Sequence, residues 1–183
     1  KQQTLLRPLA GAVLTGAPRF PAGTSGIEQG AEAAWRQLLK AHGPAKAALQ
    51  VGGAFAVALT LDDGSVFMAV DKFAIQTVCY RVDGASLRYA ARADAFGTGK
   101  PSLDPQALFD YLYVHVIPAP RTVHQGVHRL PPGHYALFKD GQLTVAPYWT
   151  PRFSPIARPS FNALRDEFRT LLRQAVRGNS TPA

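Results

Sequence analysis

The chain of 183 residues is 46% apolar, carries a formal net charge of +8 and contains one cysteine. Its length favours one sizeable core, the lone cysteine excludes an internal disulfide and a multi-thiolate zinc site, and its scattered basic residues argue against a nucleic-acid surface. No apolar run approaches the roughly eighteen residues of a membrane span, and Arg7 and Pro8 interrupt any signal-peptide core, so we expect a cytoplasmic protein that contacts no membrane.

The first predicted elements are a strand and a helix. The segment LLRPLAGAVLTG, residues 5–16, is typical of a strand that has been separated from whatever preceded it in a longer protein. Residues 25–43 predict a helix, because Ser25 and Glu28 have the spacing of a capping box and apolar residues follow at helical spacing. Gly43 and Pro44 are expected to end this helix.

Three Asp-Gly pairs predict three β-hairpins, because Asp and Gly accept the positive φ of tight hairpin turns. The pairs lie in FAVALTLDDGSVFMAV, TVCYRVDGASLRYAA and HYALFKDGQLTVAPYW, so at least six strands are expected. Residues 103–116 predict a helix with Asp104 as its N-cap and Pro105 at its first position. The resulting order of helices and hairpins predicts an α+β fold with antiparallel sheets.

The last predicted helix covers residues 160–178 and is amphipathic. We expect it to bury one apolar stripe and to expose an arginine face on the other side. That face consists of Arg165, Arg169, Arg173 and Arg177, which recur every four residues. Such a face is either simply solvated or a contact for an anion or a partner.

Three segments resemble functional motifs but fit ordinary structural roles better. His124 and His128 have the spacing of a zinc pair, which converges on a metal only in a helix, and the prolines of IPAPRTVHQGVHRLPPGHY predict a loop. The segment GTGKPS, residues 97–102, lacks the Ser or Thr that must follow the lysine of a phosphate-binding loop. Cys79 lies inside an alternating strand, where a buried thiol is expected. The chain therefore predicts no metal site and no nucleotide cofactor of its own.

Taken together, residues 53–149 resemble the amino-terminal domain of asparagine synthetases. The resemblance rests on GAFAVAL, AVDKFAIQTVCY, YVHVIPAPRTVHQGVHRLPPGHY and the closing YW, which match family patterns in one order and with similar spacing. It implies a class II glutamine amidotransferase domain with the four-layer αββα fold of amino-terminal-nucleophile hydrolases, here incomplete at its N-terminus. In that family an amino-terminal cysteine releases ammonia from glutamine, and a second domain uses ATP and Mg²⁺ to activate the carboxylate that the ammonia attacks.

Several positions depart from the family pattern. Lys1 stands at the start in place of a cysteine, and LTGAPRF replaces the glutamine-holding N-G-E segment. Residues 30–33 replace the S-D-T-E segment, whose aspartate holds the substrate's amino group, and Arg92 takes the place of the glutamate in F-A-S-E. Without a thiolate no covalent intermediate forms, and without a facing carboxylate glutamine has little reason to bind.

Two functions follow as hypotheses. In the first, residues 1–157 form a glutaminase-like scaffold without glutaminase activity, and residues 158–183 lead toward an ATP-dependent synthetase domain. In the second, the domain is an active glutaminase whose cysteine lies upstream of Lys1. The partner is the synthetase domain in both, and a homodimer is possible. We expect the proline-rich loop and the last helix to supply the contact surface for that domain, through Arg121, His124, Arg129, Pro131, Pro132, Arg165 and Arg169.

Overall fold

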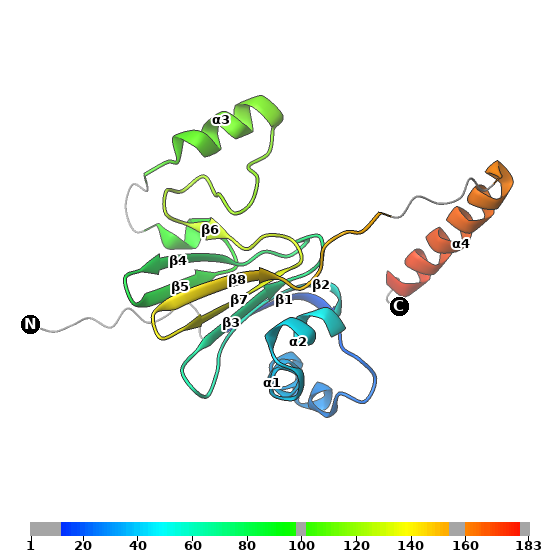
Figure 1. Cartoon of the computed structure of the whole chain (residues 1–183), viewed down its shortest axis with the longest axis horizontal. Helices are drawn as coiled ribbons and strands as arrows, with labels where there is room; N and C mark the ends of the chain where they lie inside the picture. Colours follow the sequence, from blue (N-terminus) through cyan, green and yellow to red (C-terminus); the bar gives the residue numbers. More distant parts are fainter. Residues whose placement is uncertain (1–11, 98–101, 154–159, 180–183) are drawn as a thin grey trace, which may run out of the picture. The chain divides into compact units, whose positions relative to one another are not determined.

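The computed structural model describes residues 12–97, 102–153 and 160–179 (Figure 1). The chain divides into two compact units, Lys1–Thr150 and Pro151–Ala183. Residues 98–101 of the GTGKPS segment lie outside the described residues. Residues 5–11 of the first predicted strand lie outside them as well.

Unit 1 contains, in chain order, strands, α-helices and two 3-10 helices with these bounds: β1 Ala12–Arg19, η1 Ser25–Gln29, α1 Ala31–His42, α2 Pro44–Gln50, β2 Gly52–Thr60, β3 Val66–Val70, β4 Cys79–Asp83, β5 Ser86–Ala90, η2 Ala93–Phe96, α3 Pro105–Val114, β6 His128–Arg129, β7 His134–Lys139 and β8 Gln142–Pro147. Unit 2 contains α4, Phe161–Asn179.

The strands of unit 1 form two antiparallel sheets, which confirms the predicted α+β class. The first sheet has the order β1-β2-β3-β7-β8, and the second has the order β5-β4-β6. Helices α1 and α2 cover one face of the first sheet, and the second sheet lies on its other side (Figure 1). The first sheet is therefore the central layer of unit 1.

The apolar runs of β2 and β3 follow from this central position, because both faces of these strands are covered. Phe55, Val57 and Leu59 point to the helices and pack with Trp35, whereas Ala56 and Ala58 point to the second sheet. Trp35 is fully buried, and its ring contacts the rings of Phe55 and Phe67. The two larger parts of the core thus lie under the helices and between the sheets, and a smaller cluster lies on the outer face of the second sheet.

All three predicted hairpins are present, as β2–β3, β4–β5 and β7–β8. The β7–β8 turn shows why the Asp-Gly pairs were informative. Asp140 and Gly141 have φ values of 52° and 76°, and positive φ at both central residues defines the turn that matches the twist of paired strands.

The first predicted helix is wrong at its beginning. Residues 25–29 form the 3-10 helix η1, and α1 starts only at Ala31. Gly30 separates them, because its φ of 103° is incompatible with a continuous helix. Gly43 does end α1, but Pro44 is also the first residue of α2, a helix that the sequence did not predict separately.

Helix α4 confirms the predicted last helix, but its apolar stripe is not buried as expected. The stripe side chains are 43–79% exposed: Phe161, Leu164, Phe168, Leu171, Leu172 and Val176. Unit 2 consists of one described helix, and a lone amphipathic helix has no second layer of its own on which to pack. Among the described residues, no helix has the length and apolar content to cross a membrane.

Candidate functional site

A small cavity lies beside β1, at the segments that the family resemblance assigns to glutamine binding. Its volume is about 60 Å³. Its lining residues come from β1, α1 and β2: Leu14, Thr15, Gly16, Pro18, Ala31, Trp35, Phe55 and Ala56. This space, called the β1 cavity below, has room for a few water molecules.

The backbone at Gly16 shapes the part of the β1 cavity wall that β1 contributes. Gly16 pairs with Phe55 of β2 and has a φ of 87°. A Cβ added at Gly16 would lie 2.2 Å from the carbonyl oxygen of Ala54, so a side chain is excluded at this position. The two strands therefore approach closely where the cavity begins.

The lining of the β1 cavity contains no ionisable side chain. Its polar side chain is Thr15, whose Oγ1 is buried and has no hydrogen-bond partner among the described residues. Glu32 follows the lining residue Ala31, but its carboxylate pairs with Arg36 at 2.8 Å and is not part of the lining. Through the Thr15 hydroxyl the lining can both donate and accept a hydrogen bond, but its side chains offer no charge.

Cys79 belongs to a different part of the molecule. Its side chain is 3% exposed and packs with Ala90, Phe96 and Val127 on the outer face of the second sheet. Burial raises the pKa of its thiol to about 11. A thiol with this pKa is a weak nucleophile at neutral pH, and none of its neighbours lines the β1 cavity.

The proline-rich loop corrects another expectation, because it contributes to a sheet. Its residues His128 and Arg129 form β6, which pairs with Tyr80 and Cys79 of β4. The prolines flank this strand on both sides and leave its N–H groups free to donate. The loop is therefore anchored as an edge strand.

A second cavity, called the loop cavity below, brings together three of the predicted interface residues. Arg121, His124 and Arg129 line this space of about 330 Å³ together with Cys79. Arg92, in the position of the family's glutamate, also lines it and pairs with Asp94 at 2.9 Å.

Each of these three predicted interface residues either makes a polar contact within the chain or has a buried polar atom. Arg121 Nη1 pairs with Asp104 Oδ2 at 3.2 Å, and Arg129 Nη2 donates to the carbonyl of Ile117 at 2.7 Å. The Nδ1 atom of His124 is buried without a partner among the described residues. The two guanidinium groups hold α3 and the segment after it, so their first role is structural.

The remaining predicted interface residues are not part of this cluster. Pro131 and Pro132 precede β7, and the carbonyl of Pro132 is 2.8 Å from His134 Nδ1. Arg165 and Arg169 belong to unit 2, and Arg165 pairs with Asp166 at 2.9 Å.

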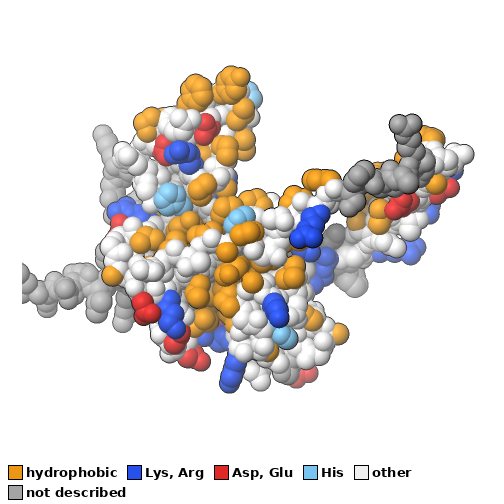
Figure 2. Space-filling model, in the orientation of Figure 1, with side chains coloured by type: hydrophobic (Ala, Val, Ile, Leu, Met, Phe, Trp, Pro, Cys, Tyr) orange, Lys and Arg blue, Asp and Glu red, His pale blue; other side chains and the backbone are white. Residues whose placement is uncertain are grey.

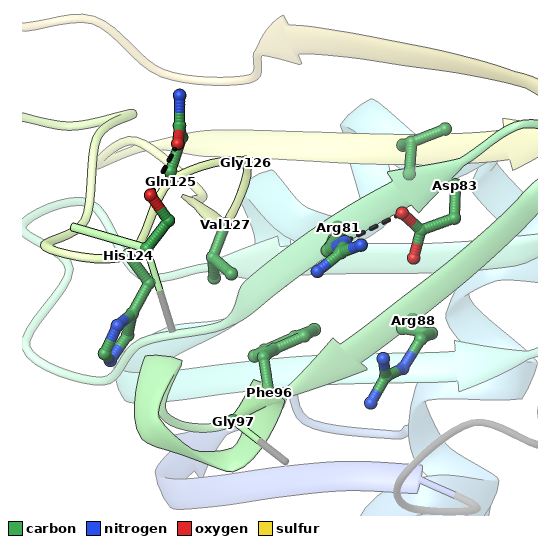
Figure 3. A pocket seen from close by; sticks show the side chains of 11 residues that line it. Arg81, Asp83, Arg88, Phe96, Gly97, His124, Gln125, Gly126 and Val127 are labelled. Atoms are coloured by element: carbon green, nitrogen blue, oxygen red, sulfur yellow. Dashed lines mark hydrogen bonds and ion pairs between the residues drawn. The ribbon is translucent and has the colours of Figure 1, made fainter. Parts of the chain in front are cut away.

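A third cavity, of about 580 Å³, lies on the outer face of the second sheet (Figure 3). Arg81 and Arg88 are directly opposite each other on β4 and β5 and lie on one side of it, with His124 and Gln125 on the other. Arg81 pairs with Asp83 at 2.7 Å. The Arg88 guanidinium lies 5.7 Å from the centre of the Phe96 ring. This cavity is polar and open, and it shares His124 with the loop cavity.

Asp71 is a buried carboxylate that the sequence reasoning missed. Its two oxygens accept the backbone N–H groups of Phe55, Phe73, Ile75 and Gln76 at 3.0–3.2 Å. It therefore joins β2 to the turn after β3. The available signal was an acidic residue directly after the wholly apolar run VFMAV.

Comparison with known protein families supports the resemblance. The family model described as a glutamine amidotransferase domain matches residues 36–149. This match covers more than half of the chain, and the chain belongs to the glutamine amidotransferase domain family.

Three curated relatives sharpen the assignment. Proteins from Mycobacterium bovis and from two strains of Mycobacterium tuberculosis, each named "Putative asparagine synthetase (glutamine-hydrolyzing)", are 36% identical to this chain over 78 residues. The matched segment covers 40% of this chain and 12% of each relative. The chain is thus a glutamine amidotransferase domain related to asparagine synthetases.

Proposed function

We propose that this chain is a glutaminase-like domain without glutaminase activity, which serves as a scaffold in an asparagine-synthetase-like, ATP-dependent amide-forming enzyme. The proposal includes the four-layer αββα arrangement of amino-terminal-nucleophile hydrolases. It also places ATP and Mg²⁺ in a separate synthetase domain, which is the partner of this one.

The observation that carries the proposal is the lining of the β1 cavity. Free glutamine carries an α-ammonium and an α-carboxylate, and each must find an opposite charge or strong hydrogen bonds when it leaves water. The residues of this lining supply one hydroxyl and no charge. Transfer of the zwitterion into such a site costs several kcal/mol that no contact offsets.

The position of Ala31 supports the same conclusion. By the family resemblance, Ala31 stands where an aspartate holds the substrate's amino group, and it lines the cavity directly. A methyl group in place of a carboxylate removes the charge that would select an amino acid. The loss therefore concerns substrate binding, independently of the nucleophile.

Binding and turnover of glutamine test the proposal separately. Isothermal titration calorimetry of this chain with L-glutamine should give no saturable heat up to about 10 mM, a concentration at which even millimolar binding would be visible. Release of ammonia should stay at the level of a blank without protein. An active glutaminase serves as the positive control for both measurements.

An active domain with a cysteine upstream of Lys1 gives the opposite result. A functional substrate pocket would bind glutamine with a millimolar or better dissociation constant, and ammonia release would appear once the upstream residues are present. Saturable glutamine binding by this chain, or hydrolysis by a longer native form, overturns the scaffold proposal.

A further inference from the structure

Two arginines stand side by side on the outer face of the second sheet. Arg81 of β4 and Arg88 of β5 are directly opposite in the antiparallel register, so their side chains leave the same face of the sheet. Like charges in such a position destabilise a pair of strands. The cavity of about 580 Å³ lies against this pair (Figure 3). An anion bound in that cavity would offset the repulsion between the two side chains.

Neither arginine has all of its hydrogen-bond donors satisfied within the chain. Asp83 contacts Arg81 at Nε, and the terminal Nη groups of Arg81 make no hydrogen bond to a described residue. The Arg88 guanidinium makes no ion pair or hydrogen bond within the described part of the chain. Among the described residues that line the cavity, Asp83 is the one acidic residue. The lining thus carries two guanidinium charges against one carboxylate.

The Phe96 ring holds the Arg88 guanidinium without using its hydrogen-bond donors. The guanidinium lies 5.7 Å from the ring centre, and an aromatic ring attracts the charge while the N–H groups stay available for an oxygen acceptor. Phe96 is itself buried and packs with Cys79 and Val127. The support for Arg88 is therefore in place before a ligand binds.

The opposite wall of the cavity is polar and contains no carboxylate among the described residues. His124, Gln125 and Ser102 contribute to it, and Ser102 Oγ donates to Gln125 Oε1 at 2.9 Å. Gly126 adds no side chain, and a Cβ built there would meet no atom within 4 Å. The cavity volume lies in the range of about 300–1,000 Å³ that is usual for small-molecule sites. The space therefore admits a ligand larger than a single-atom ion.

The overall charge of the chain does not explain this pair. The formal net charge is +8, but on the visible face of unit 1 the Lys and Arg side chains are spread out and form no single patch (Figure 2). A nucleic acid needs a basic track that follows many phosphates. Two arginines at one cavity instead fit a small ligand with one or two anionic groups.

We propose that Arg81 and Arg88 bind a small oxyanion, namely the carboxylate or phosphate group of a small molecule. Planar guanidinium groups bind such oxygens through paired N–H donors. Asp83 competes with the ligand for Arg81, because both are anions. The cavity shares no lining residue with the β1 cavity, so this site is independent of the proposed function.

Heteronuclear NMR titration of the isotope-labelled 183-residue chain tests the proposal. Inorganic phosphate and succinate are added in separate experiments at about 20 mM NaCl, where screening is weak. The backbone amides of residues 124–127 and the Nε–H groups of Arg81 and Arg88 should shift saturably. At least one probe should bind with a dissociation constant of about 0.1–5 mM, and the tighter probe identifies the anionic group that the site prefers.

Two variants should change the affinity in opposite directions. Arg88→Gln should weaken binding at least about tenfold, because it removes one of the two guanidinium groups. Asp83→Asn should tighten binding about threefold or more, because it removes the competing carboxylate. Asparagine before Gly84 retains the hairpin turn. Unchanged amide spectra away from the cavity establish that both variants are folded.

The matched control is Arg173→Gln on α4, which removes the same charge from a different part of the chain. It should leave the dissociation constant unchanged within about twofold. Shifts that rise linearly with both probes up to about 50 mM overturn the proposal. Equal weakening by Arg88→Gln and Arg173→Gln also overturns it, because binding would then follow net charge. So does an Asp83→Asn variant that binds the probe more weakly.

Discussion

Strands β2 and β3 and helix α3 are similarly apolar in sequence, yet they have opposite environments. The strands lie in the central layer and are covered by α1 and α2 on one side and by the second sheet on the other. In helix α3 the buried side chain is Ala107, and the other apolar side chains are exposed. An apolar run therefore reports burial only where a second layer stands opposite it, and elsewhere its apolar side chains stay exposed.

Removal of the Asp71 carboxylate should have the largest effect, because it acts within the buried region. Asp71→Ala leaves four backbone N–H groups without their acceptor. We expect the free energy of unfolding to fall by about 3–5 kcal/mol, measured by urea denaturation. Asp71→Asn keeps one acceptor oxygen and should lose less. A loss below about 1 kcal/mol in Asp71→Ala would mean that water replaces the carboxylate.

The same substitution in both regions tests the comparison directly. Leu59 is fully buried in β2, and Leu112 is exposed on α3. Leu59→Ala should cost about 2–5 kcal/mol of unfolding free energy, because it leaves a cavity in the core. Leu112→Ala should cost less than about 0.5 kcal/mol, because the side chain is exposed. Similar losses at both positions would show that α3 is covered within the monomer.

The smallest effect concerns the start of α3 and depends on pH. The backbone N–H groups of Ala107 and Gln106, and then Arg121, hold the pKa of Asp104 below its ordinary value of 3.8. A carboxylate whose pKa is lowered by folding stabilises the fold at every pH above its pKa in the unfolded chain. This contribution is lost as the pH falls through the pKa that the group has in the folded protein. Acidification below about pH 4 should therefore loosen α3 before the core unfolds.

Amide hydrogen exchange of residues 105–114 measures this loosening. Asp104→Asn is the matched control, because an asparagine keeps the capping oxygen and does not titrate in this range. In that variant the protection factors of the α3 amides, which are corrected for the pH dependence of intrinsic exchange, should not respond to acid. An equal response in both proteins would assign the effect to another group.

Local features of the fold could be predicted from the sequence because they depend on neighbouring residues. The Asp-Gly turns and the Asp104 cap each act within four residues, and the structure has all of them. The break at Gly30 could not be predicted in this way. Its φ is set by how η1 and α1 pack, and a capping-box spacing at Ser25 fits a 3-10 helix as well.

The candidate site was predictable only in part, for a similar reason. The family resemblance pointed to the segments around Thr15 and Ala31, and both residues line the β1 cavity. The size of that cavity depends on how closely β1 and β2 approach, which their pairing decides. The grouping of Arg121 with Arg129 follows from β6, a strand of two residues that carries no periodic pattern.

The burial of Cys79 has a consequence for the chemistry of the whole molecule. It is the one cysteine of the chain, and with a pKa of about 11 it is ionised in about one molecule in a thousand at pH 8. Thiol reagents and oxidants therefore meet an almost inert group while Phe96 and Val127 cover it, and a more reactive one when these side chains move away from the outer face of the second sheet. The rate at which this single sulfur is modified reports how often that cover opens.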